Sequence, residues 1–320
     1  MNDNIETNDE KFYRDIQHNF YEKFETKIEP KVYPIELERR EKLKLAHFLS
    51  GLIAISGIIL FFFGSFGGST VGGELVCLSV FCFLMVFLPK KAIAQSFEYK
   101  IKKLVMPLVC SCYGTLYWGN GTYKGNTSLL KKACVIPSFD IVYYDDIFGG
   151  THKGITFEII EGKYTWQTPG KINRIVTVFN GVILKVKLDK NFLGHTVLCS
   201  DSDFRNLSLK ELKRVTLKDV KFEDKFDVFT DDEIEARYLI TPSFMERLKN
   251  IKTAFFANAV RCAFYHGFLF IALSTPKDLF SLCSLDKPVD DFKQYNVLCE
   301  EIISIIKLID YFKLDEKIGL

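Results

Sequence analysis

Residues 46–66 read AHFLSGLIAISGIILFFFGSF, a stretch without charged side chains in which His47 is the only titratable group. About 20 apolar residues in a helix, each adding about 1.5 Å, cross a hydrocarbon core of about 30 Å. A core helix of a soluble protein is rarely apolar on every face over such a length. The stretch therefore predicts a transmembrane helix.

A second apolar run follows after a Gly-rich connector that has no basic residue. Residues 75–88 read LVCLSVFCFLMVFL. Because this run alone is short for a membrane span, we expect its helix to begin near Val71. The two runs predict a transmembrane hairpin over residues 46–90, with spans at about 46–66 and 71–88. A re-entrant or interfacial second segment is the alternative.

Charges beside the two runs predict how the hairpin lies in the membrane. Lys and Arg are enriched on the cytoplasmic side of membrane helices. Basic residues flank the hairpin at both ends and are Arg39, Arg40, Lys42, Lys44, Lys90, Lys91, Lys100, Lys102 and Lys103. We therefore expect a multi-pass protein of the cytoplasmic (inner) membrane with both termini cytoplasmic and the lipid bilayer as its partner. Polar residues 1–45 precede the first run, which disfavours a signal peptide.

Residues 1–45 are predicted to form a polar N-terminal arm that contains an amphipathic helix. Within residues 9–28, apolar side chains recur at steps of four, which is the spacing of one helix face. This stripe consists of Phe12, Ile16, Phe20, Phe24 and Ile28. We expect Pro30 and Pro34 to end the helix. Acidic residues are as frequent as basic ones on its polar side, which favours docking on the chain's own soluble domain, or an oligomer contact, over anionic lipid.

Residues 91–320 are predicted to form a cytosolic α+β domain, a largely antiparallel sheet covered by helices. A strand over 139–147 is expected to end at Gly149-Gly150. Two hairpins are predicted to turn at Glu161-Gly162 and at Asn180-Gly181, since Asn-Gly is the strongest short hairpin signal.

Later segments add strands and helices to this domain. Residues 195–201 are expected to extend the strand meander, and a further strand pair is expected to turn at His266-Gly267. Thr230 to Glu233 form a capping box at a helix start. Pro242 is expected to open the next helix, and an amphipathic helix is predicted over 291–312.

Composition limits the classes of partner and cofactor. Lys+Arg 42 against Asp+Glu 40 gives a net charge of +2, so the chain lacks the basic field that nucleic-acid binding demands. The cysteine number is nine, no two of them form a C-x-x-C pair, and the histidines are scattered. Neither a metal site nor a cofactor is therefore expected, and reduced thiols suit a reducing compartment.

Several polar side chains are candidates for a functional site. Asp145 and Asp146 could bind a cation or position a substrate, but adjacent carboxylates on a strand point to opposite faces. A paired-acid site would therefore need a third group from elsewhere in the chain, and turn chemistry is the plainer interpretation. His195 and Cys199 lie about 13 Å apart along a strand, too far for a nucleophile pair. The candidates are Asp145, Asp146, His152, His195, Glu235 and Arg237.

Several of these segments resemble a known family. The run FEDKFDVFTDDEIEARYLITPSFMERL (222–248), followed by AFYHGFLFIAL (263–273), resembles domain-of-unknown-function family 3137, a family of bacterial membrane-anchored proteins. DDIFGG (145–150) and VFNGVILKVKLDKNFLGHTVL (178–198) support the resemblance, which covers about residues 95–285. It implies a cytosolic domain of mixed architecture on a bacterial cytoplasmic membrane. The family brings no established reaction, so no catalytic residue can be carried over.

These observations favour a membrane-anchored cytosolic binding or assembly module without a recognisable catalytic site. Its partner would be another protein or further copies of the chain. The alternative is a membrane-bound, hydrolase-like enzyme acting on lipid or cell-envelope material, which would need a cleft that collects Asp146, His152, His195 or Glu235. A third possibility, lipid or small-ligand binding, would need an enclosed apolar cavity.

Overall fold

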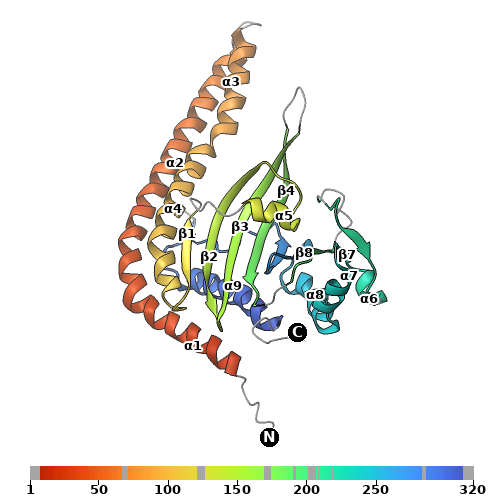
Figure 1. The fold of residues 1–320 in the computed structure, drawn as a ribbon. Helices are drawn as coiled ribbons and strands as arrows, with labels where there is room; N and C mark the ends of the chain where they lie inside the picture. Colours follow the sequence, from red (N-terminus) through yellow and green to blue (C-terminus); the bar gives the residue numbers. More distant parts are fainter. Residues whose placement is uncertain are drawn as a thin grey trace. The chain divides into compact units, whose positions relative to one another are not determined.

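The computed structural model describes residues 8–66, 71–120, 127–168, 174–189, 192–200, 207, 209–217, 219–282 and 286–312. The predicted hairpin connector falls partly outside these residues. Figure 1 shows the order of the elements along the chain. They are α1 (Asn8–Lys23), η1 (Phe24–Ile28), α2 (Glu29–Phe66), α3 (Val71–Met85), α4 (Leu88–Cys110), β1 (Tyr117–Asn120), α5 (Thr127–Ala133), β2 (Ile141–His152), β3 (Ile155–Thr168), β4 (Arg174–Lys187), β5 (Thr196–Cys199), β6 (Lys213–Val215), α6 (Val220–Glu223), β7 (Asp227–Thr230), α7 (Glu233–Leu239), α8 (Pro242–Ala254), β8 (Ala259–Tyr265), β9 (Phe268–Ser274) and α9 (Phe292–Tyr311).

The chain divides into two compact units. Unit 1 comprises Met1–Cys112 and Ser281–Cys299, and unit 2 comprises Tyr113–Phe280 and Glu300–Leu320. The boundary passes through α9, so the first turns of this helix belong to unit 1 and the later turns to unit 2. Unit 1 is helical, whereas unit 2 holds the sheet.

In unit 1, helical structure runs without a break from α1 through the π-helical turn η1 into α2. The prediction that Pro30 and Pro34 end the first helix is therefore wrong, since Pro34 lies inside α2. Burial of the apolar stripe explains the difference, because the stripe continues past both prolines with Val32 and Ile35, which are buried. Tertiary packing thus outweighs the local cost of proline, and the wider π turn directly before Pro30 shifts the backbone hydrogen-bond register there.

The stripe of the N-terminal helix docks on the chain itself. The Phe24 ring lies 4.9 Å from the rings of both Phe292 and Tyr295 at the start of α9. The Phe20 ring lies 6.2 Å from that of Phe292. Aromatic pairs at these distances stabilise packing beyond the area they bury. Self-docking within unit 1, the interpretation that the sequence favoured, accounts for this face of the helix.

A buried carboxylate also joins α2 to the segment before α9. Glu36, which is 2% exposed, accepts hydrogen bonds from Arg39 Nε at 2.7 Å and Nη2 at 2.8 Å. It accepts two more, from Arg40 Nε at 2.8 Å and from the backbone N–H of Val289 at 2.8 Å. The hydrogen bonds from Arg39 contribute most, and together with those from Val289 and Arg40 they lower the pKa of Glu36 to about 2 despite its burial.

Small residues let α2 and α3 approach closely. A Cβ at Gly64 would lie 2.9 Å from the Gly72 carbonyl oxygen, and one at Gly57 would lie 3.3 Å from Cys82 Cβ. Ser50 Oγ donates to the Val86 carbonyl at 2.7 Å. Their outer faces stay uncovered, because only 11% of the most apolar stretch of each helix is buried in the structure. Two helical stretches, Glu10–Phe66 and Val71–Cys110, are long and apolar enough to cross a membrane; α3 forms the first part of the second stretch.

Unit 2 contains one sheet in the order β1-β2-β3-β4-β9-β8-β5-β7-β6. The paired neighbours run antiparallel throughout. The α+β class with an antiparallel sheet is thus confirmed. The turn between β8 and β9 is also confirmed, with φ of 50° at His266 and 75° at Gly267.

Two other predicted turns are wrong. Glu161-Gly162 and Asn180-Gly181 lie inside the continuous strands β3 and β4, where Gly162 pairs with Gly181. A Cβ at Gly181, whose φ is +146°, would lie 2.1 Å from the Leu273 carbonyl oxygen. Glycine is therefore needed here for close approach of neighbouring strands, which local sequence does not distinguish from a turn.

The ends of two other segments also differ from prediction. β2 continues through Gly149-Gly150 to His152, and a Cβ at Gly150 would lie 3.0 Å from the Thr115 carbonyl oxygen. The segment that was expected to extend the meander, β5, pairs with β7 and β8 instead of β4. In the sheet, β9 and β8 lie between β4 and β5.

The predicted helix starts are close to those observed. Asp232, rather than Thr230, caps α7 by accepting from the Glu235 N–H at 3.0 Å. Thr230 Oγ1 instead accepts from the Asp232 N–H at 3.1 Å, which shapes the turn before the helix. Pro242 opens α8 and the last helix is α9, as predicted.

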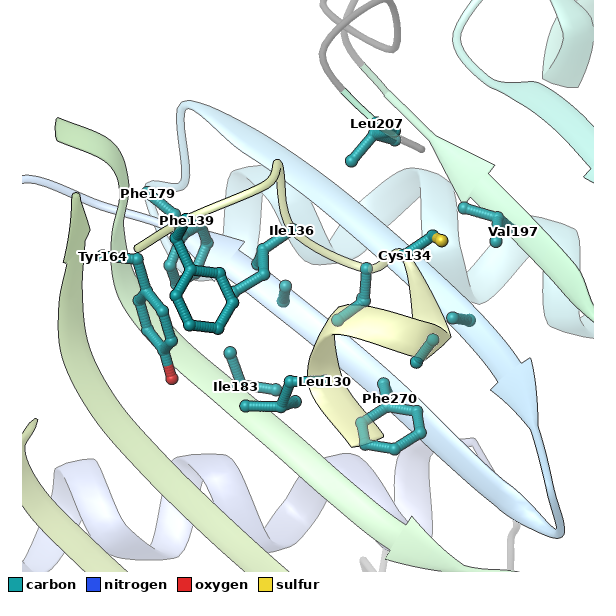
Figure 2. Close-up of a cluster of buried hydrophobic side chains, with 14 of the residues drawn as sticks. Leu130, Cys134, Ile136, Phe139, Tyr164, Phe179, Ile183, Val197, Leu207 and Phe270 are labelled. Atoms are coloured by element: carbon teal, nitrogen blue, oxygen red, sulfur yellow. The ribbon is translucent and has the colours of Figure 1, made fainter. Parts of the chain in front are cut away.

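Both faces of the sheet in unit 2 are covered. Figure 2 shows α5 and the following segment on one face, where the Tyr164 ring contacts Phe139 at 5.0 Å and Phe179 at 5.6 Å. The later turns of α9 lie on the other face (Figure 1). The central residues of β8 and β9 are accordingly buried without alternation.

Candidate functional site

A β-bulge gathers acidic side chains on β2 and β3. Tyr144 pairs with Gly162 and Ile147 with Ile160, so Asp145 and Asp146 together oppose Glu161. A bulge places two residues against one and redirects their side chains. The interpretation of the two aspartates as turn residues is therefore wrong, because they lie in the middle of β2.

Two further acidic residues, Glu161 and Asp278, lie close to Asp145. One carboxylate oxygen each of Asp145, Glu161 and Asp278 lies within 4.8 Å of the other two. Glu161 is only 5% exposed, whereas Asp145 and Asp278 reach solvent. We call these three residues the acid cluster. Sequence reasoning missed Glu161, read as part of a turn, and Asp278, which is remote along the chain.

The two oxygens of Glu161 have different surroundings. Oε1 accepts a hydrogen bond from the Leu279 N–H at 2.8 Å. Oε2 is buried and has no hydrogen-bond partner among the residues that the structure describes. Burial, followed by the negative charge of Asp146, raises the pKa of Glu161 to about 9. The surroundings of Glu161 thus disfavour the charged form of its carboxyl group.

Asp146 follows Asp145 in the bulge of β2 but is not among the three mutually close carboxylates. It is fully buried, and its Oδ1 accepts from Trp118 Nε1 at 2.7 Å. The indole comes from the edge strand β1, whose Asn120 pairs with Asp146. A buried carboxylate needs such donors to remain charged. Asp146 is therefore held in place beside Glu161.

The segment that carries Asp278 is fixed to the sheet. Asn180 Nδ2 donates to the Thr275 carbonyl at 3.0 Å, and the Thr275 N–H donates to the Asn180 carbonyl at 3.0 Å. The Phe280 ring packs against Phe148 at 4.9 Å. Contacts on both sides of Asp278 thus determine where its carboxylate can lie.

His152, another predicted residue, ends β2 some six residues from Asp146, or about 20 Å along the strand. It is buried, and its Nε2 lies 2.9 Å from Asp310 Oδ1. Lys153 Nζ lies 2.9 Å from the same oxygen. These contacts join the end of β2 to the later turns of α9.

His195 and Glu235 hold the segment before β5. The two carboxylate oxygens of Glu235 accept from the N–H groups of Leu193 at 3.0 Å and Gly194 at 2.6 Å. His195 Nε2 lies 2.9 Å from the Ala133 carbonyl, which can only accept, so this nitrogen carries the proton. Burial lowers the pKa of His195.

Arg237 has contacts of the same kind. Its guanidinium pairs with Glu233 one turn earlier at 2.7 Å and donates to the Thr216 carbonyl at 2.7 Å. The ion pair is exposed, so it contributes little to stability.

The structure does not bring the predicted residues into one cleft. Five strand spacings separate β2 from β5, or about 24 Å, so Asp146 and His195 cannot share a site. Glu235 lies on α7, and its carboxylate bonds the backbone of Leu193 and Gly194 beside His195. Among the described residues, the cleft that the hydrolase-like alternative would need is therefore not formed by Asp146 and His195.

A pocket of about 440 Å³ lies elsewhere in unit 2, and mostly apolar side chains line it. Across its rim, Lys277 Nζ pairs with Glu301 at 2.6 Å. In the part of the chain that the structure describes, none of the six predicted residues lines it. The lining comes from Asn250, Ile251, Phe255, Phe256, Lys277, Leu279, Glu301, Ser304, Ile305, Lys307, Leu308 and Tyr311.

Comparison with known proteins gives a family match over part of the chain. A family model described as "Protein of unknown function (DUF3137)" matches residues 177–314. No curated protein matches the chain. The crystal structure of the mycobacterial trehalose monomycolate transport factor A, TtfA, aligns with a TM-score of 0.32 and 9% identity, over 60% of this chain and 97% of that chain. A likeness of this size carries no argument about fold or function.

Proposed function

We propose, for this member of the DUF3137 family of proteins of unknown function, a role as a membrane-anchored binding or assembly module. In this proposal α2 and α3 cross the cytoplasmic membrane, and unit 2 acts in the cytosol. The uncovered apolar surface of the hairpin is the observation that carries it.

Large apolar side chains of the hairpin face outward. Phe63 is 64% exposed, Phe66 78% and Leu84 72%. Burying one such side chain contributes about 1.5–3 kcal/mol, and soluble monomers rarely expose apolar patches larger than a few hundred Å². A surface of this kind along two packed helices favours lipid as the surrounding medium.

Flanking charges support the proposed orientation. Lys90 follows α3 and pairs with Asp286 at 2.6 Å, and Lys42 precedes the first apolar stretch and pairs with Glu38 at 3.1 Å. Such basic flanks favour the cytoplasmic side, which would leave only the hairpin tip outside.

An exposed apolar end of the β3–β4 ribbon supports a binding role. β9 pairs with residues 181–187 of β4, whereas the earlier residues of β4 extend past β9 and pair with β3. Near its end, Trp166 pairs with Val176, and they are 40% and 44% exposed. Ile175 beside them is 61% exposed. Aromatic and apolar side chains at such a projection are typical of protein-binding surfaces.

Membrane crossing is tested by alkaline carbonate extraction and by labelling with a membrane-impermeant maleimide. The chain should stay in the carbonate-resistant fraction. A Gly73→Cys variant, where a side chain meets nothing within 4 Å, should be labelled from outside intact cells. A Glu41→Cys variant should be labelled only after permeabilisation. Release by carbonate, or equal labelling of both variants above that of the parent, would contradict the proposal.

Partner binding is tested by placing a photo-crosslinking amino acid at Trp166 in native membranes. The expected result is a single recurring adduct, with another protein or with a second copy, that Ile175→Asp abolishes. The same amino acid at Lys213, an exposed residue of β6, serves as the control. Recovery of monomer alone from position 166 would argue against a binding role.

A further inference from the structure

We propose that Asp145, Glu161 and Asp278 form a binding site for a divalent cation of the calcium class. This inference concerns unit 2 and does not depend on the membrane anchoring proposed above. Acidic side chains often lie together without an ion, but the surroundings of Glu161 favour one here.

The buried oxygen of Glu161 needs a partner. Oε2 lies in a side chain that is 5% exposed, and no donor from the described part of the chain reaches it, whereas Oε1 accepts from the Leu279 N–H. Leaving a buried polar atom unsatisfied costs about 1–3 kcal/mol. A carboxylate with one oxygen held by an N–H group and the other without a donor is suited to coordinate a cation.

The spacing fits a hard cation with oxygen ligands. Calcium takes six to eight oxygens at about 2.3–2.6 Å, in flexible geometry. Oxygens within 4.8 Å of one another can reach one ion at that distance with small side-chain adjustments. Magnesium requires a stricter octahedron at about 2.0–2.1 Å and loses its waters reluctantly. Zinc prefers nitrogen and sulfur ligands, which this set lacks.

The cluster is open on one side and fixed on the other. Asp145 and Asp278 are exposed, so an ion can enter from solvent and keep water as its remaining ligands. Glu161 is held by Leu279 N–H, and Thr275 fixes the segment of Asp278 to Asn180. A preformed ligand set loses less entropy on binding.

Buried Asp146 makes the site more negative. It does not belong to the group of mutually close oxygens, but its charge acts on Glu161. A divalent ion would offset the repulsion among these carboxylates, which ordinarily disfavours placing them together. Asp146 is therefore assigned as a positioning residue and not as a ligand.

The test uses the purified full-length chain in detergent, with CaCl₂ in calorimetric titration and TbCl₃ in luminescence titration. Trp118 contacts Asp146 and can sensitise the terbium emission. The expected result is saturable binding, with calcium displacing terbium at a dissociation constant between ~10⁻⁶ and ~10⁻³ M. Magnesium should bind at least tenfold more weakly.

Two variants and a matched control locate the site. Glu161→Gln retains an oxygen for Leu279 N–H, and Asp278→Asn changes an exposed residue, so both keep the fold. Each should weaken calcium binding at least tenfold. Glu158→Gln, on the same strand with its carboxylate paired to Lys185 at 3.0 Å, should bind as the parent does.

Melting temperatures give an independent readout. Millimolar CaCl₂ should raise the melting temperature of the parent and of Glu158→Gln, but not that of Glu161→Gln or Asp278→Asn, because a ligand that binds only the folded state stabilises it. Absence of saturable binding in the parent, unchanged affinity in both cluster variants, or equal affinity for magnesium would overturn the proposal.

Discussion

Replacing Glu36 by Gln should destabilise unit 1 through the loss of one buried charge. The carboxylate of Glu36 accepts from Arg39, Arg40 and the Val289 N–H. Gln has nearly the same shape, so the change removes charge and leaves packing largely intact. Arg39, which is 7% exposed, then loses the carboxylate that accepts its two hydrogen bonds. Breaking one side of a buried ion pair is strongly destabilising.

The magnitude follows from the pKa. The pKa of Glu36 falls from 4.5 to about 2 on folding, and a pKa difference of one corresponds to about 1.4 kcal/mol of stability. The charge therefore stabilises the folded chain by about 3 kcal/mol at pH 7. For a domain of this size that loss lowers the melting temperature by about 10 °C.

The pH dependence gives the prediction a sign. Because the folded pKa is the lower one, the stabilisation is complete above about 4.5 and is lost as the pH falls towards about 2. The difference between the parent and Glu36→Gln should therefore be full at pH 7 and nearly absent near pH 2.

The assay is thermal unfolding of the detergent-solubilised chain between pH 7 and pH 2, with hydrogen exchange at the Val289 amide as a local readout. Glu41→Gln, an exposed position of the same helix, is the control and should change stability by less than about 0.5 kcal/mol. An equal melting difference at pH 7 and at low pH would refute the electrostatic argument, since protonation of the parent would then have no effect.

Three further outcomes are expected. Gly57→Cys should form a disulfide with Cys82 on oxidation in membranes, because its Cβ would lie 3.3 Å from Cys82 Cβ. Gly51→Cys, whose Cβ would meet no described atom within 4 Å, should not form one. A maleimide mass-shift assay counts the remaining thiols. Gly181→Ala should lower the free energy of unfolding by more than about 2 kcal/mol, since it combines φ of +146° with a Cβ 2.1 Å from a carbonyl oxygen. Gly267→Asn, at φ +75° with open space around its Cβ, should be tolerated and serves as the control. Glu235→Ala should speed hydrogen exchange at the Leu193 and Gly194 amides at a cost of about 1–3 kcal/mol, with Glu233→Ala as a control that affects neither amide.

Long periodic segments were predictable from the sequence. The stripe on α9 and the uniform apolar runs of the hairpin each specify a helix through many residues at once, so no single residue decides the outcome. Pro30 and Pro34 misled the prediction because their local effect is real but smaller than the packing of the stripe around Phe24. That packing depends on Phe292, which sequence proximity does not indicate.

Strand ends and the acid cluster were less accessible. Gly162 and Gly181 were read as turns, because a glycine needed for close strand approach has the same local signature as one needed for a turn. Asp145 and Asp146 were recognised as requiring a third acid. Its identity depended on the β2–β3 register and on the position of the Asp278 segment, and both are set by the topology of the sheet.

The misread glycines and the acid cluster have a common structural cause. Gly162 directly follows Glu161 and pairs with Gly181, and Asn180 beside Gly181 bonds the Thr275 backbone in both directions. From Thr275 the chain continues to Asp278 and to Leu279, whose N–H returns to Glu161. The close approach that these glycines permit thus brings the acidic segment against β3. Departures from regular strand pattern are more often retained where a site needs them, which is a reason to test the acid cluster before the other polar groups of unit 2.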